Sequence, residues 1–97
     1  MKYYSTRNKS LSYDFRSIFE RGLAPDGGLF IPKEIIRFSE EELTKLSKLS
    51  YLDLATEIIH CFCKENFSKD NVSKIVKKSY SKFQHKDVVE IKKFEDL

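Results

Sequence analysis

The segment Asp26-Gly27-Gly28 is the sharpest feature in this sequence whose residue types and spacing could do chemistry. It lies between Pro25 and the apolar run Leu29-Phe30-Ile31. Glycine adopts a positive φ at the least cost, so the segment predicts a tight turn. Bare glycine N–H groups and an adjacent carboxylate also suit contact with a ligand or with another domain's site. Neither a GxGxxG spacing nor a Gly-Lys-Ser/Thr ending is present, which excludes the usual phosphate-binding loops.

Four residues invite interpretation as a metal site: His60, Cys61, Cys63 and His85. Residues two apart on a helix point about 200° away from each other, so Cys61 and Cys63 cannot both bind one ion while helical. His60 and Cys63 share a face, but two ligands on one face, with His85 in a distant loop, fall short of a site. We therefore predict no metal ligands here, and we expect both cysteines to be free thiols.

Residues 69–86 are rich in lysine: they contain six lysines and one acidic residue, Asp70. Tyr80 and Phe83 are interleaved with them, which fits an amphipathic helix with a solvated basic face. The alternative is a stand-alone binding module whose basic face meets an acidic partner or nucleic acid. The sequence holds no recognisable RNA- or DNA-reading motif, and its net charge is only +3, so we predict no nucleic-acid partner.

Length and composition indicate one soluble globular domain spanning residues 1–97, with 40% apolar and 34% charged residues. No apolar stretch approaches the roughly 20 residues of a membrane span, and the first residues lack the apolar segment of a signal peptide. We therefore expect a cytoplasmic protein without a membrane partner. No serine, cysteine or histidine has a recognisable base and orienting group, so no catalytic residue is predicted within the chain.

Apolar periodicity predicts four helices. The first runs over 13–21 behind a Ser12 cap, with Phe15, Ile18 and Phe19 on one face. The second follows the capping-box sequence Ser39-Glu40-Glu41-Glu42. The third starts after Ser50 and ends near Lys64, with an apolar stripe that includes Ile58 and Ile59. The fourth starts after Ser68, ends near Gln84-His85, and directs Val72, Ile75, Val76, Tyr80 and Phe83 to the core.

Three shorter segments are typical of strands: residues 3–7, residues 29–31 closed by Pro32, and residues 88–94. Long helices together with these short strands predict an α+β fold, with about four helices and a small two- or three-stranded sheet. The order in which the strands pair stays open at this point.

Several landmarks taken together resemble the N-terminal domain of threonine synthases. The opening Tyr3-Tyr4-Ser5-Thr6-Arg7 is similar to their Tyr-x-Ser-Thr-Arg strand. Residues 22–32, Gly-Leu-Ala-Pro-Asp-Gly-Gly-Leu-Phe-Ile-Pro, are similar to their Gly-Leu-Ala-x-Asp-Gly-Gly-Leu segment, which is followed by an aromatic, an aliphatic and Pro. Residues 49–55 and 80–83 resemble the same domain's later helices, so the resemblance spans essentially the whole chain.

The resemblance implies a lyase of the tryptophan-synthase-β-like fold type, which uses pyridoxal phosphate (PLP) to convert O-phospho-L-homoserine and water to L-threonine and phosphate. In that family the cofactor lysine sits in a Gly-Pro-Thr-x-x-Phe-Lys-Asp segment, and these 97 residues contain no such segment. The resemblance therefore implies PLP in the parent enzyme and no cofactor-binding residue here. We expect these residues alone to bind no PLP and to be inactive.

The same resemblance implies a partner, namely the catalytic domains of the parent enzyme. We expect an exposed apolar patch where those domains dock. Asp26, Gly27 and Gly28 are the first candidates for a loop that faces the active site, because the unusual backbone chemistry lies there. Ser5, Thr6 and Arg7 are the second candidates, with a strand end and a solvent-facing arginine as the alternative interpretation.

Overall fold

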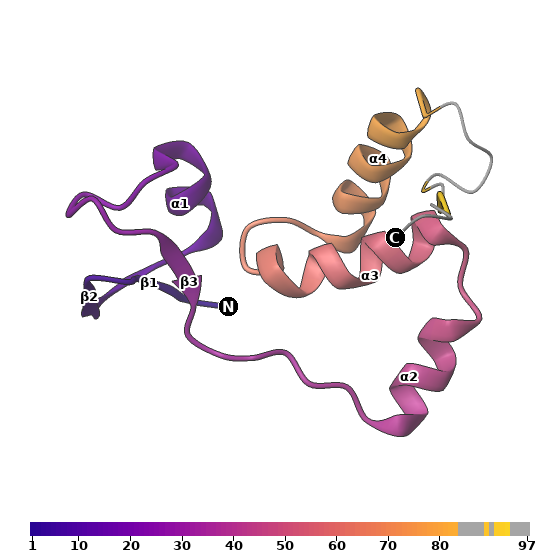
Figure 1. Ribbon diagram of the computed structural model, residues 1–97, viewed down its shortest axis with the longest axis horizontal. Coiled ribbons are helices and arrows are strands. Elements are labelled where there is room, and N and C mark those ends of the chain that lie inside the picture. The colour runs from indigo at the N-terminus through magenta and orange to yellow at the C-terminus, as the bar shows by residue number, and fades with distance from the viewer. Residues whose placement is uncertain (84–88, 90, 94–97) are drawn as a thin grey trace.

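The computed structural model describes residues 1–83, 89 and 91–93. Within them the chain forms three strands and four helices, which confirms the α+β class (Figure 1). The elements in chain order are β1 (Tyr3–Ser5), β2 (Asn8–Tyr13), α1 (Phe15–Arg21), β3 (Phe30–Pro32), α2 (Glu40–Ser47), α3 (Tyr51–Cys63) and α4 (Lys69–Tyr80). The strand expected over residues 88–94 falls largely outside the described residues. No described helix is long and apolar enough to cross a membrane.

The sheet is antiparallel, with the order β2-β1-β3, so the first strand lies in the centre. Tyr3 faces Tyr13 on one side and Pro32 on the other, while Ser5 faces Asn8 and Phe30. Pro32 has no N–H to donate, and its place on an edge strand agrees with that loss. Alternate residues of β1 are buried, which places Tyr3 and Ser5 on the same covered face.

Two sequence predictions near the first helix were wrong. The strand over residues 3–7 ends at Ser5, and residues 8–13 form a strand that the sequence did not predict. Its composition is polar and its residues are mostly exposed, so pairing with β1 rather than its own pattern makes it a strand. Ser12 therefore lies in β2, and α1 is capped two residues later by Asp14, whose carboxylate accepts a 2.9 Å hydrogen bond from the Ser17 amide.

The caps of the other helices were predicted correctly. Ser39 and Glu42 form both halves of a capping box, and the hydroxyls of Ser50 and Ser68 each accept a hydrogen bond from the amide three residues later. The end of α4 was predicted too late, because that helix stops at Tyr80 rather than near residues 84–85. Phe83 sits in the following turn, where its ring meets the Tyr80 ring edge-on at 4.9 Å.

Helices α3 and α4 pack against each other and contain the core, while the sheet and α1 lie at the other end of the molecule (Figure 1). Cys63, Val72 and Val76 are buried at this packing, and the core's partly buried neighbours are Phe15, Leu52, Ala55, Phe67 and Tyr80. The Tyr3 hydroxyl donates to the Phe62 carbonyl, and the N-terminal amine pairs with Glu65 at 2.8 Å. These two contacts tie the central strand to the end of α3.

Several apolar residues of the predicted helix faces are exposed, and two of them, Ile75 and Phe83, were expected in the core. Phe19 is 77% exposed and Ile75 is 55% exposed, and Ile58, Ile59 and Phe83 also keep more than a third of their surface accessible. Phe83 lies beyond the end of α4, whereas the other four residues lie on helix faces that no described element covers completely. The chain therefore presents a substantial apolar surface to its surroundings.

Candidate functional site

The two segments predicted as candidate sites lie side by side and form one cluster, which we call the Ser5–Asp26 cluster: residues 5–7 and 26–28. The Ser5 hydroxyl donates to Asp26 Oδ1 at 2.7 Å, and the Gly28 amide donates to the same oxygen at 2.9 Å. Arg7 Nη1 donates to the Asp26 carbonyl at 3.0 Å. The end of β1 and the loop before β3 are thus held together by hydrogen bonds from both sides.

Both glycines of the cluster are required by their surroundings. Gly27 has a φ of +82°, which L side chains rarely adopt, and a Cβ there would lie 2.9 Å from Arg7 Nη1. A Cβ on Gly28 would collide with Ser5 Oγ and would lie 2.9 Å from Thr6 Oγ1. The absence of side chains therefore allows the loop to close onto the strand end and leaves room for the Arg7 guanidinium.

The hydrogen bonds of the cluster determine the charge of Asp26. The Ser5 hydroxyl, followed by the Gly28 amide, holds the pKa of the Asp26 carboxyl below its usual value, and the Arg7 charge acts in the same direction. A carboxylate with a lowered pKa is a weak proton acceptor near neutral pH, so the arrangement suits a fixed anion rather than a general base. Arg7 is exposed and presents a positive charge beside the loop.

The residues considered for a metal site are occupied with local contacts. His60 Nε2 lies 3.1 Å from the Phe67 carbonyl, and the thiols of Cys61 and Cys63 donate to carbonyls one turn earlier in α3. Burial raises the pKa of the Cys63 thiol, which disfavours the thiolate that a metal or a nucleophilic reaction needs. Among the described residues no group of three His, Cys, Asp or Glu could hold an ion. His85 lies outside the described part of the chain.

The basic face of α4 makes ion pairs within the molecule. Lys69 pairs with Glu57 on α3 at 3.0 Å, and Lys74 pairs with Asp70 one turn earlier at 3.1 Å. These partners offset part of the positive charge on which a nucleic-acid interface would depend. The geometry agrees with a solvated helix face.

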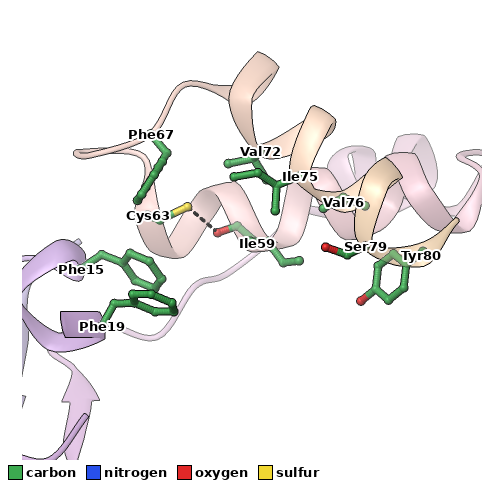
Figure 2. Close-up of a pocket in the computed structure, with 10 residues that line it drawn as sticks. All are labelled: Phe15, Phe19, Ile59, Cys63, Phe67, Val72, Ile75, Val76, Ser79 and Tyr80. Carbon is green, nitrogen blue, oxygen red and sulfur yellow. Dashed lines mark hydrogen bonds between the residues drawn. The ribbon is translucent and has the colours of Figure 1, made fainter. Parts of the chain in front are cut away.

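A wide apolar groove lies between α1, α3 and α4, with a cavity volume of about 350 Å³ (Figure 2). We call it the α1–α4 groove, and its lining residues are Phe15, Phe19, Ile59, Cys63, Phe67, Val72, Ile75, Val76, Ser79 and Tyr80. None of these side chains carries a formal charge at neutral pH. The sequence predicted an exposed apolar patch but did not place it, because Ile75 was assigned to the core, and Phe19 and Ile59 were assigned only to apolar helix faces.

Comparison with known proteins decides the family. Residues 2–80 match the family described as Threonine synthase N terminus. The chain belongs to the threonine synthase N-terminus family. This match covers the Ser5–Asp26 cluster and all four described helices.

Individual threonine synthases show the same relationship. The chain is 32% identical over 92 residues to threonine synthase of Pseudomonas aeruginosa, covering 95% of this chain and 20% of that protein. It is 35% identical over 92 residues to threonine synthase-like 2 of Xenopus laevis, covering 94% of this chain and 20% of that protein. A crystal structure of PLP-bound threonine synthase from Brucella melitensis matches with a TM-score of 0.87 and 30% identity, covering 96% and 20%. The chain thus spans about a fifth of the length of these relatives.

Proposed function

We propose that the chain is the N-terminal domain, residues 1–97, of a cytoplasmic, PLP-dependent threonine synthase. The reaction is the conversion of O-phospho-L-homoserine and water to L-threonine and phosphate. The observation that carries the proposal is the match of residues 2–80 to the threonine synthase N-terminus family. A PLP-bound relative of the same N-terminal structure supports PLP as the cofactor of the complete enzyme.

The residues of this chain do not fit PLP by themselves. The family's Gly-Pro-Thr-x-x-Phe-Lys-Asp segment is absent from the 97 residues. Among the described residues every buried side-chain nitrogen or oxygen already has a hydrogen-bond partner, so no polar group is left waiting for a phosphate or a pyridine ring. The domain therefore contributes binding and positioning to the enzyme, and the isolated residues 1–97 are inactive.

Within the enzyme, the Ser5–Asp26 cluster faces the entrance of the active site. Two features support this role. Both the carboxylate and the carbonyl of Asp26 accept hydrogen bonds within the cluster, which makes the cluster rigid. A rigid element can hold the active site of another domain in position. The cluster also presents Arg7 at its surface, and a guanidinium suits the anionic substrate of this reaction.

Asp26→Ala in the complete enzyme tests this role. Loss of the carboxylate frees Ser5 and Gly28, and we expect kcat/KM to fall by about tenfold or more while PLP occupancy stays unchanged. Asp14→Ala is the matched control, since Asp14 is also a hydrogen-bonded carboxylate with a lowered pKa, but its partners Ser17 and Asn66 lie outside the cluster. It should lower Tm without lowering kcat/KM. A folded Asp26→Ala enzyme with normal kcat/KM would refute the role of the cluster.

The assignment of the enzyme itself has a separate test. The complete protein that carries this domain should form threonine and phosphate from O-phosphohomoserine, and purified residues 1–97 should form neither. Threonine formation by the complete protein supports the proposed function whatever the Asp26 variant does. A complete protein that binds no PLP and leaves O-phosphohomoserine unchanged would refute the proposed function.

A further inference from the structure

The α1–α4 groove joins the two halves of the molecule. Phe15 and Phe19 reach into it from α1, Cys63 lies at its floor on α3, and Ile75 borders it from α4 (Figure 2). The ring of Phe15 lies 6.0 Å from that of Phe19 and 6.1 Å from that of Phe67, so an aromatic row continues from the covered interior to the open side. Anything seated in the groove would contact the sheet end and the helical end together.

The lining of the groove runs from buried to open residues. Cys63 is 4% exposed, whereas Ile75 is 55% and Phe19 is 77% exposed. Soluble monomers rarely leave a contiguous apolar surface of this kind open, and such surfaces mark sites where another protein surface packs. The lining has no charged side chain, which excludes an ionic ligand and calls for an apolar occupant.

We propose that the α1–α4 groove is the surface on which the catalytic part of a threonine synthase docks. This inference rests on the proposed function, and it names the docking face. The occupant is the catalytic region present in the relatives, which are about five times longer than the part that the chain matches. The groove holds the occupant by apolar packing, and the occupant in turn clamps α1 against α3 and α4. Docking here therefore fixes the sheet, and with it the Ser5–Asp26 cluster, relative to the catalytic region.

The lysine face of α4 provides an internal reference for the experiment. Lys77 is two residues from Ile75, so it points about 200° away from Ile75 around the helix and away from the groove. Both positions are exposed in the domain. Single cysteines at these positions therefore report separately on the groove and on the opposite face of the same helix.

The test measures the rate at which iodoacetamide alkylates Ile75→Cys and Lys77→Cys, each in a Cys61→Ser background, with the adduct located by peptide mass analysis. The rates are compared between residues 1–97, whose fold is checked by circular dichroism, and the complete enzyme. We expect the cysteine at position 75 to react about tenfold or more slowly in the enzyme, and that at position 77 to change less than about twofold. Equal rates at position 75 in both proteins would overturn the proposal.

A second pair of variants, made in the complete enzyme, shows whether apolar packing in the groove causes the protection. Phe19→Asp should restore fast alkylation at position 75, because a carboxylate cannot be buried in an uncharged groove. Ile35→Asp is the control, since Ile35 is 83% exposed and lies outside the groove. Equal effects of the two variants would place the contact elsewhere and overturn the proposal.

The other possible occupant is a second copy of the chain. Protection of position 75 in isolated residues 1–97 that increases with their concentration would identify that occupant and refute docking of the catalytic region. Enzyme activity is measured on the same samples. An enzyme that makes no threonine but protects position 75 contradicts the proposed function and leaves the docking face standing, so the two failures are distinct.

Discussion

Ser5 donates a 2.7 Å hydrogen bond to the carboxylate of Asp26, which follows it by 21 residues. The bond joins the central strand to the glycine loop at a point where Ser5 is only 2% exposed. Two segments that looked like separate candidate sites are therefore one structural unit. A substitution in residues 5–7 should therefore alter the structure of residues 26–28, and the reverse should also hold.

Gly28→Ala should destabilise the domain, because its Cβ would collide with the Ser5 hydroxyl. Overpacking of this kind costs about 1–3 kcal/mol of unfolding free energy, measured by urea denaturation followed by circular dichroism. The same change in a Ser5→Ala background should cost less, because the nearest clashing atom is gone. Strictly additive effects of the two changes would contradict the close approach of these residues.

Asp14 predicts a pH dependence of stability. Hydrogen bonds from Ser17 and Asn66 lower its pKa from 3.8 to about 2. An acid with a lower pKa in the folded state stabilises the fold when ionised, so its contribution is present above pH 3.8 and is lost as pH falls towards 2. Asp14→Asn keeps a cap oxygen but does not titrate. The Tm difference between wild type and this variant should therefore shrink between about pH 5 and pH 2; a difference independent of pH would exclude this role.

Tyr3→Phe removes the hydroxyl that donates to the Phe62 carbonyl and so links the sheet to α3. We expect a loss of about 0.5–1.5 kcal/mol in unfolding free energy, the usual contribution of one such hydrogen bond. Tyr4→Phe is the control, because Tyr4 points to the opposite face of β1 and keeps its ring beside Lys9. Chemical denaturation of both variants measures the difference, and equal losses would count against the link.

Neighbouring residues of α4 should respond differently to truncation. Val76→Ala opens a space in the buried core and should cost about 2 kcal/mol in residues 1–97. Ile75→Ala removes a larger side chain but one that is mostly exposed, so it should cost less than about 1 kcal/mol there. Urea denaturation of the two variants gives the comparison. The reverse order would mean that Ile75, rather than Val76, is the core residue.

Local chemistry made part of the fold predictable. The caps at Ser39, Ser50 and Ser68 each need only a hydroxyl and an amide three residues later, so the sequence contains the whole interaction. Strand β2 was missed because its partner, not its composition, makes it a strand. Long-range pairing of this kind leaves little trace in a single sequence.

The candidate site was predictable in its parts and not in its assembly. Asp26-Gly27-Gly28 stood out because glycine pairs are rare outside special turns, and Ser5 stood out only through the family resemblance. Their contact depends on β1 pairing with β3, which the sequence left open. Ile75 was placed in the core, and Phe19 only on an apolar helix face, because periodicity identifies such a face but does not say whether an element of the same domain covers it.

The central position of β1 has a consequence for synthesis on the ribosome. Of the three strands, β1 emerges before the others. It finds β2 within a few residues, but its other edge stays open until β3 follows, and Tyr3 meets its α3 partner only 59 residues later. At roughly 5–20 residues per second, that interval lasts roughly 3–12 s. The open edge of β1 stays unpaired until β3 is made, and Tyr3 lacks its α3 partner for the whole interval. Strand β1 is thus made before both of its partner strands, and its contacts are completed late.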